Sequence, residues 1–252
     1  MSEVLRLQHA SVQFGAHQAL REVSLSIHAG ERVALVGANG CGKSTLLRVA
    51  HGLLPLSQGQ VTRASAVRQA MVFQRPHMMP ARVRQQVSLS LWLAAKPLQR
   101  WPLGWAADAW AAWQAASEQT EGVLHQAHLH EQAHLPAQAL SMGQRQRLAF
   151  ALALARKPQV LFLDEPTAHL DPQGKRDMET RIREACEPDA NGVSLTLIFS
   201  SHNLGQVKRL ASRVWYVEHG AILADLPTER FFGEDLSASH PEAHAFLKGE
   251  RE

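Results

Sequence analysis

The chain has few cysteines, no long apolar segment and no cluster of one charge. Only two of its 252 residues are cysteines, Cys41 and Cys186, and their separation matches no metal-binding spacing, which indicates a reducing compartment. No uninterrupted apolar run approaches the roughly 20 residues that cross a bilayer. Residues 1–6 carry no apolar core or cleavage site of a secretory signal. These absences predict a soluble, cytoplasmic protein.

The charge balance argues against nucleic acid as a partner. The formal net charge is +3, from 26 Lys and Arg against 23 Asp and Glu, and the basic residues are scattered along the chain. The 14 histidines add little charge at pH 7, because an unperturbed imidazole titrates near ~6.5. With 45% hydrophobic residues, the chain can bury the core of one large domain or of a domain with a subdomain.

A glycine-rich segment follows a short apolar run. Residues 32–36 read Arg-Val-Ala-Leu-Val, and residues 37–45 read Gly-Ala-Asn-Gly-Cys-Gly-Lys-Ser-Thr, which has the form GxxxxGK[ST]. Glycine allows backbone conformations that turn successive N–H groups inward on an anion. A helix starting near Lys43 adds the positive end of its dipole. The segment therefore predicts a nucleoside triphosphate site, and a chance glycine-rich turn is the less favoured interpretation.

The residue types of this loop suit phosphate chemistry. Lys43 is expected to reach the outer phosphates, and the Ser44 hydroxyl is expected to ligate Mg²⁺. The predicted nucleotide-binding residues of the loop are Gly37, Asn39, Gly40, Cys41, Gly42, Lys43, Ser44 and Thr45.

An apolar run ending in two carboxylates lies further along the chain. Residues 160–163 read Val-Leu-Phe-Leu, and Asp164 and Glu165 follow directly. In P-loop enzymes an acid at that strand end holds the Mg²⁺ shell, which is the role expected of Asp164. A second acid can polarise the attacking water, which makes Glu165 the candidate base. A solvated strand end is the alternative interpretation of the pair.

Four polar or glycine positions come where predicted strands end. They are Gly37, Gln74, Asp164 and His202. Open parallel sheets bind ligands at the carboxyl ends of their strands. We therefore expect the four positions to converge on one site.

Residues 140–147, Leu-Ser-Met-Gly-Gln-Arg-Gln-Arg, precede an Ala- and Leu-rich run that extends to Arg156. Ser141 suits a helix N-cap. The functional alternative is a second phosphate site, formed by the N–H groups of the helix N-terminus. Because one domain needs only one loop for its triphosphate, this alternative implies a site shared between two subunits.

The order of these patterns predicts an α/β fold in a single domain of residues 1–252. Residues 1–74 and 158–252 are expected to form a P-loop NTPase core, with a RecA-like mixed sheet and an antiparallel β edge. Residues 75–157, rich in Ala, Gln and Leu, are expected to form an inserted helical subdomain.

Five of the six tryptophans fall in that helical segment: Trp92, Trp101, Trp105, Trp110 and Trp113. Trp101 and Trp105 share one helix face if that turn is helical. Packing within the subdomain is the favoured interpretation. The alternative is a surface that meets a membrane partner or lipid headgroups.

The ordered set of phosphate loop, Gln74, residues 140–144, the two acids and His202 resembles the ATP-binding cassette of ABC transporters over nearly the whole chain. The resemblance implies ATP and Mg²⁺ as cofactors and ATP hydrolysis as the activity. It also implies a homodimer that forms on ATP binding, with two ATP molecules sandwiched between facing subunits. Integral membrane permease subunits are the implied partners, and an extracytoplasmic binding protein is an indirect one. The implied location is the cytoplasmic face of the inner membrane.

The resemblance also assigns individual roles. Phe14 would stack on adenine, and Gln74 would touch Mg²⁺ or the water and sense the membrane partner. His202 would contact the γ-phosphate. Ser141, Gly143 and Gln144 would bind the γ-phosphate of ATP held by the other subunit. The implied catalytic set is Glu165, His202 and Gln74, and the implied metal set is Ser44, Gln74 and Asp164.

Two positions depart from the family pattern. Met142 replaces the first glycine of the usual Leu-Ser-Gly-Gly-Gln, and a positive φ there would be costly for a residue with a Cβ. Cys41 stands inside the phosphate loop, where a helix N-terminus can lower the pKa of a thiol. Inhibition by a thiol-alkylating reagent, with protection by ATP, is the corresponding expectation.

The transported substrate is the least constrained prediction. Residues 73–76 and 241–250 look similar to cassettes of oxyanion importers, particularly the tungstate type. Residues 75–80 are the candidate groove for the partner's coupling helix, in which methionine would adapt to the contact. The alternatives are the ATPase of another ABC importer or exporter, and a soluble ABC ATPase of DNA repair or ribosome function. A P-loop kinase or GTPase is disfavoured, because such a protein would have no element like residues 141–144.

Overall fold

A computed structural model describes residues 2–65, 67–95, 105–190 and 192–249, except the side chains of residues 105–109. The chain forms two compact units. The first contains Met1–Gln74, Pro158–Ala168 and Arg176–Glu252, and the second contains Arg75–Lys157 and His169–Lys175.

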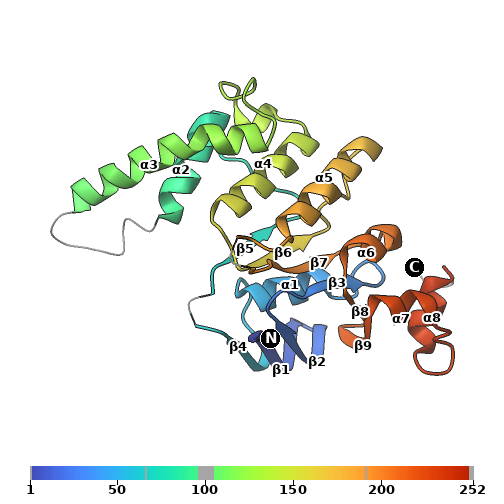
Figure 1. The fold of residues 1–252 in the computed structure, drawn as a ribbon. Helices are drawn as coiled ribbons and strands as arrows, with labels where there is room; N and C mark the ends of the chain where they lie inside the picture. The colour runs from blue at the N-terminus through green and yellow to red at the C-terminus, as the bar shows by residue number, and fades with distance from the viewer. Residues whose placement is uncertain (1, 66, 96–104, 191, 250–252) are drawn as a thin grey trace. The chain divides into compact units, whose positions relative to one another are not determined.

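The strands of the first unit form two sheets (Figure 1). The antiparallel sheet has the order β2-β1-β4, and the larger sheet has the order β5-β6-β7-β3-β8-β9. In the larger sheet all neighbouring pairs from β5 to β8 are parallel, and β9 is antiparallel to β8. The strands are β1 (Glu3–Phe14), β2 (His17–His28), β3 (Arg32–Val36), β4 (Gln58–Arg63), β5 (Gln69–Val72), β6 (Val160–Asp164), β7 (Thr196–Ser200), β8 (Arg213–Glu218) and β9 (Ala221–Pro227).

The centre of the larger sheet explains the apolar runs in the sequence. Every residue of β6 and β7 is buried, as is typical of parallel strands covered on both faces. Helix α1 (Lys43–His51) packs against both strands and ends at Gly52, whose φ of 97° closes the helix in the left-handed conformation. The predicted α/β class, the mixed sheet and the antiparallel edge are confirmed.

Two features of the antiparallel sheet are not visible in the sequence pattern. Strand β1 is one continuous strand of 12 residues, and an irregularity near His9, with φ 48°, shifts its register and interrupts the alternation of its side chains. Strand β4 was not predicted. Its residues are mostly exposed and polar, so no alternating apolar pattern marks it.

The second unit is helical. Helices α2 (Val83–Ala94), α3 (Trp105–Gln126) and α4 (Met142–Ala155) surround a core of leucine, valine and alanine side chains. A short 3₁₀ turn, η2 (Ala137–Ala139), precedes α4. Within the described ranges, no helix is both long and apolar enough to span a bilayer.

The tryptophans of this unit have different surroundings. The rings of Trp92 and Trp113 pack edge to face with centroids 6.4 Å apart, as the packing interpretation predicts. Trp110 is 64% exposed and is not part of the core. Trp101 and the side chain of Trp105 lie outside the described residues.

The chain ends in the first unit. Strands β8 and β9 form a hairpin, and its turn is His219-Gly220, both with positive φ. Helix α5 (Pro172–Ala185) begins in the second unit and continues in the first, which also contains α6 (Leu204–Leu210). Two short helices, α7 (Thr228–Gly233) and α8 (Pro241–Leu247), were not predicted.

Candidate nucleotide site

The loop between β3 and α1 has the geometry that its glycines predict. The φ angles of Gly37, Gly40 and Gly42 are 144°, 77° and 115°. A Cβ on Gly37 would lie 2.1 Å from the carbonyl oxygen of Val217, and one on Gly42 would lie 2.8 Å from that of Ala19. Both the backbone conformation and the lack of space therefore require glycine at these two positions.

Lys43 is the first residue of α1, and its side chain is buried against the loop. Its ammonium donates hydrogen bonds of 2.7 Å to the carbonyl oxygens of Gly37 and Ala38. Gly42 caps the helix without a side-chain hydrogen bond, so no side chain occupies the cap position. Such an N-terminus, with a cation beside it, suits a phosphate anion.

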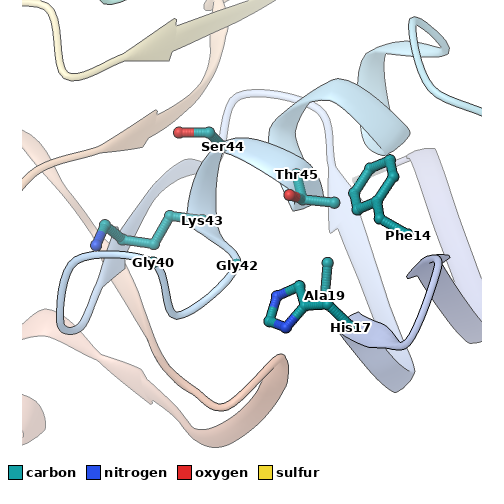
Figure 2. Close-up of a pocket in the computed structure, with 8 residues that line it drawn as sticks. All are labelled: Phe14, His17, Ala19, Gly40, Gly42, Lys43, Ser44 and Thr45. Atoms are coloured by element: carbon teal, nitrogen blue, oxygen red, sulfur yellow. The ribbon is translucent and has the colours of Figure 1, made fainter.

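A pocket of about 240 Å³ lies beside this loop. Phe14 and Lys43 lie at opposite ends of it (Figure 2), and Phe14 is 51% exposed. The lining residues are Phe14, His17, Ala19, Gly40, Gly42, Lys43, Ser44 and Thr45. An exposed aromatic ring next to a phosphate loop suits a flat base, and the stacking role of Phe14 stays a prediction.

His17 and Ala19 line the pocket and were not predicted as site residues from the sequence. Phe14 and His17 are paired residues that flank the tight turn at Gly15, where φ is 59°. Pairing across a two-residue turn was the available signal, because a hairpin places both side chains at its tip. Of the other predicted loop residues, Asn39 is exposed and Cys41 is buried.

The carboxylate of Asp164 lies at the carboxyl end of β6 and is 2% exposed. Its Oδ1 atom accepts hydrogen bonds from Ser44 at 2.9 Å and from Ser200 at 2.7 Å. Hydroxyl and carboxylate oxygens are ligands that Mg²⁺ takes in phosphate sites. The oxygens of Ser44 and Asp164 therefore fit the predicted metal role, and Mg²⁺ bound there would neutralise charge that develops on a phosphate. The metal role of Gln74 stays a prediction.

The three predicted catalytic side chains come together, with Gln74 and His202 both at the Glu165 carboxylate. The Nε2 atom of Gln74 donates to Glu165 Oε2 at 2.9 Å, and His202 Nδ1 lies 3.3 Å from the same oxygen. Glu165 itself has a φ of 45°, which residues other than glycine rarely adopt. Unusual backbone conformations of this kind cluster at functional sites, because surrounding structure must hold them.

Ser141, Gly143 and Gln144 lie in the second unit, at the start of α4. The Ser141 hydroxyl accepts a hydrogen bond from the backbone N–H of Gln144 at 3.3 Å. The side-chain oxygen Oε1 of Gln144 accepts one from the backbone N–H of Ser141 at 2.8 Å, and the two bonds form a capping box. Met142 is the first helical residue and is not among the positive-φ positions. The conditional concern about strain at Met142 therefore does not apply.

The predicted low pKa of Cys41 is wrong. The residue is only 7% exposed, and burial raises the pKa of its thiol, while the nearby Lys43 ammonium lowers it by less. Burial likewise raises the pKa of Cys186 to about 11. Desolvation disfavours the thiolate, and this effect exceeds the attraction of the cation and the helix N-terminus.

Alkylation of Cys41 in the folded protein should therefore be slow. We expect iodoacetamide at pH 7.5 to modify Cys41 at least ~10-fold more slowly in the native chain than in urea, because the thiolate is the reactive form and is disfavoured here. Time-resolved mass spectrometry of peptides containing Cys41 and Cys186 measures both rates. Equal native and unfolded rates at Cys41 would contradict the buried, neutral thiol.

Comparison with known proteins relates this geometry to one family. The family described as "ABC transporter" matches residues 20–168. The aliphatic sulfonates import ATP-binding protein SsuB 1 of Rhizobium johnstonii is 36% identical, over 85% of this chain and 73% of that protein. The arginine transport ATP-binding protein ArtM of Bacillus subtilis is 29% identical, over 97% of this chain and 99% of that protein. The phosphonates import ATP-binding protein PhnC of Caulobacter vibrioides is 33% identical, over 92% and 91%.

Solved structures support the same fold. The cbiO1 structure from Clostridium perfringens aligns with a TM-score of 0.71 at 23% identity, and covers 98% of this chain and 100% of that one. The cassette MJ0796, in a dimeric structure bound to ADP and Pi, aligns with a TM-score of 0.72 at 22% identity, over 89% and 98%. At these identities the structures establish the fold, and the sequence matches establish the family. The chain belongs to the ABC transporter family, as an ATP-binding cassette that hydrolyses ATP.

Proposed function

We propose that this chain is the ATPase subunit of an ABC importer for a small anionic solute. The observation that carries the ATPase part of the proposal is the cluster in which Gln74 and His202 both contact the Glu165 carboxylate, next to an Asp164 carboxylate held by Ser44. The cluster places a candidate base beside a candidate metal ligand. The phosphate loop and its lysine precede it in the same unit.

The chain's own residues supply the steps of hydrolysis. Lys43 leaves the loop carbonyls and binds the outer phosphates, and Phe14 holds the base. Glu165 orients water and accepts its proton as the water oxygen bonds to the γ-phosphorus. The bond from that phosphorus to the bridging oxygen breaks, ADP leaves with that oxygen, and His202 contacts the γ-phosphate. Most of the catalysis in such a site comes from positioning and from preorganised charge. Gln74 is hydrogen-bonded to Glu165 and directly precedes residues 75–80, so a change at the catalytic carboxylate can move that segment.

We further propose that the active form is a head-to-tail homodimer with two ATP molecules. Each ATP would lie between the Lys43 loop of one copy and Ser141, Gly143 and Gln144 of the other. The start of α4 supports this arrangement, because the helix dipole and the N–H groups of the first turn other than that of Gln144, which Ser141 caps, suit a γ-phosphate. The dimeric MJ0796 structures supply the analogy.

Membrane permease subunits are the proposed partners, which places the chain at the cytoplasmic face of the inner membrane. An extracytoplasmic binding protein would be an indirect partner. The division into a core and a helical subdomain at residues 75–157 is proposed as the arrangement that transmits closure. In the candidate groove for the partner's coupling helix, residues 75–80, Met78 cannot supply the predicted contact with the partner. Its side chain is only 5% exposed, and its sulfur accepts a hydrogen bond from Gln86.

The solute proposal rests on analogy. Relatives are named for sulfonates and phosphonates, which are oxyanions, and others for amino acids. Tungstate does not occur in the names of these relatives, so the oxyanion class is proposed and tungstate is only one member of it. The ATPase of an exporter and a soluble non-transport ABC ATPase are the alternatives.

A pull-down and a transport assay test this proposal together. We expect the tagged chain to co-purify with an integral membrane protein and not with ribosomes or DNA. In proteoliposomes that contain the complex and its binding protein, an alkanesulfonate, a phosphonate or an oxyanion such as tungstate should stimulate ATP hydrolysis several-fold, since the solute signal must reach the cassette. Arginine serves as the comparison solute. Recovery of ribosomes or DNA without a membrane protein would contradict the transporter role.

A further inference from the structure

Ser200 is a buried hydroxyl at the same strand end as the two acids. It is the last residue of β7, and the parallel register pairs it with Asp164 of the neighbouring strand β6. Its exposed fraction is 0%. The sequence alone predicts no role for it, because a serine before a predicted turn carries no signal of its own.

The Ser200 hydroxyl uses its donor and an acceptor position on two different functional groups. It donates to Asp164 Oδ1 at 2.7 Å and accepts from the backbone N–H of Glu165 at 2.9 Å. A serine hydroxyl has one donor and two acceptor positions, so this single side chain can fix both groups at once. The shorter bond is to a charged acceptor and is the stronger of the two.

These bonds hold features that the site depends on. Glu165 has a φ of 45°, and the bond from its N–H to Ser200 orients the peptide that leads into this conformation. Asp164 Oδ1 is also bound by Ser44 at 2.9 Å. Ser44 is expected to turn to the metal when nucleotide binds, whereas Ser200 is buried and is positioned to keep its bond to the carboxylate.

We propose that Ser200 is a positioning residue for ATP hydrolysis, which sets the orientation of the Asp164 carboxylate and of the Glu165 backbone. It acts through these two residues and does not contact the nucleotide. The inference deepens the proposed ATPase mechanism and rests on the roles proposed there for Asp164 and Glu165.

The consequence is a selective loss of turnover when the hydroxyl is removed. In Ser200→Ala, kcat should fall roughly tenfold, which is the expected effect of one lost hydrogen bond to a charged group. The Kd of a fluorescent ATP analogue without Mg²⁺ should stay within about twofold, because the loop and Phe14 are untouched. The Mg²⁺ concentration that gives half-maximal turnover should rise. Ser200→Thr keeps a hydroxyl and should recover most of kcat.

Thr196→Val is the matched control on the same strand. Thr196 is 1% exposed, and its hydroxyl accepts a hydrogen bond from the Gly30 amide at 2.9 Å, at the opposite end of β7 from the acids. Its loss should lower the melting temperature at least as much as Ser200→Ala, with kcat unchanged. If Ser200→Thr does not fold, the comparison of Ser200→Ala with Thr196→Val still decides the matter.

The outcomes separate this inference from the proposed function. A tenfold lower kcat with unchanged analogue affinity in Ser200→Ala alone supports the positioning role. A wild-type kcat in Ser200→Ala overturns it, and so does an equal loss of kcat in Thr196→Val or a parallel loss of nucleotide affinity. Absence of ATPase activity in the wild-type chain would instead contradict the proposed mechanism itself.

Discussion

Glu165→Gln should abolish steady-state ATP hydrolysis while leaving ATP binding intact. The amide keeps the size and one hydrogen-bonding oxygen of the carboxylate, but it cannot accept a proton from water or carry its negative charge. Loss of a positioned base lowers rates by about 10² to 10⁴. The side chain is also the common partner of Gln74 and His202, so its charge organises the cluster.

Phosphate release measures turnover in this variant, and equilibrium dialysis with radiolabelled ATP measures binding. Glu184→Gln is the control, because Glu184 is an exposed residue on α5. Its turnover should equal that of the wild type. Turnover of Glu165→Gln within threefold of the wild type would remove Glu165 from the catalytic role and leave Asp164 or His202 as candidates.

Lys43→Ala should lose ATP affinity rather than turnover alone. The ammonium is the only side-chain cation among the residues that line the described pocket, apart from the ionisable ring of His17. Charge-assisted hydrogen bonds to phosphate contribute about 1.5–3 kcal/mol each, so a roughly 10- to 100-fold rise in Kd for ATP is expected. Isothermal titration calorimetry measures the change directly.

The lysine also holds the empty loop, because it donates to the carbonyls of Gly37 and Ala38. Thermal unfolding without nucleotide therefore accompanies the titration, to separate lost binding from lost folding. Arg48→Ala on the exposed face of the same helix is the control and should bind ATP as the wild type does. Unchanged ATP affinity in a folded Lys43→Ala variant would contradict the assigned phosphate contact.

The parts of the site nearest to strand ends were predictable from sequence. The apolar runs before Gly37 and Asp164 identify buried parallel strands. Parallel strands of one sheet have their carboxyl ends at the same edge of that sheet. The glycine requirement at Gly37 follows from the same pattern, and the structure adds the reason, which is the Val217 carbonyl 2.1 Å from a Cβ there. Local sequence was sufficient because backbone geometry and strand order fix these positions.

Individual hydrogen bonds between distant residues, the burial of a thiol and an exposed polar strand were not predictable. The contact of Ser200 with Asp164 joins residues 36 positions apart, and only the register of β6 against β7 creates it. The pKa of Cys41 was predicted in the wrong direction, because the helix N-terminus is visible in the sequence and the burial of the thiol is not. Strand β4 is polar and mostly exposed, and it is defined by pairing with β1 rather than by its own pattern.

The mass of the Glu165→Gln variant with ATP and Mg²⁺, measured by light scattering after size exclusion, tests the shared nucleotide site most directly. We expect the Glu165→Gln variant to have about twice the 27.8 kDa mass of one chain. The double variant with Gly122→Arg is the control and should have the same doubled mass, because Gly122 on α3 has open space around it. The double variant with Ser141→Arg should bind ATP with unchanged affinity and stay at the mass of one chain, because the opposing helix start is blocked. Equal dimer formation with Ser141→Arg, at equal ATP occupancy, would contradict a nucleotide held between the Lys43 loop of one copy and residues 141–144 of the other.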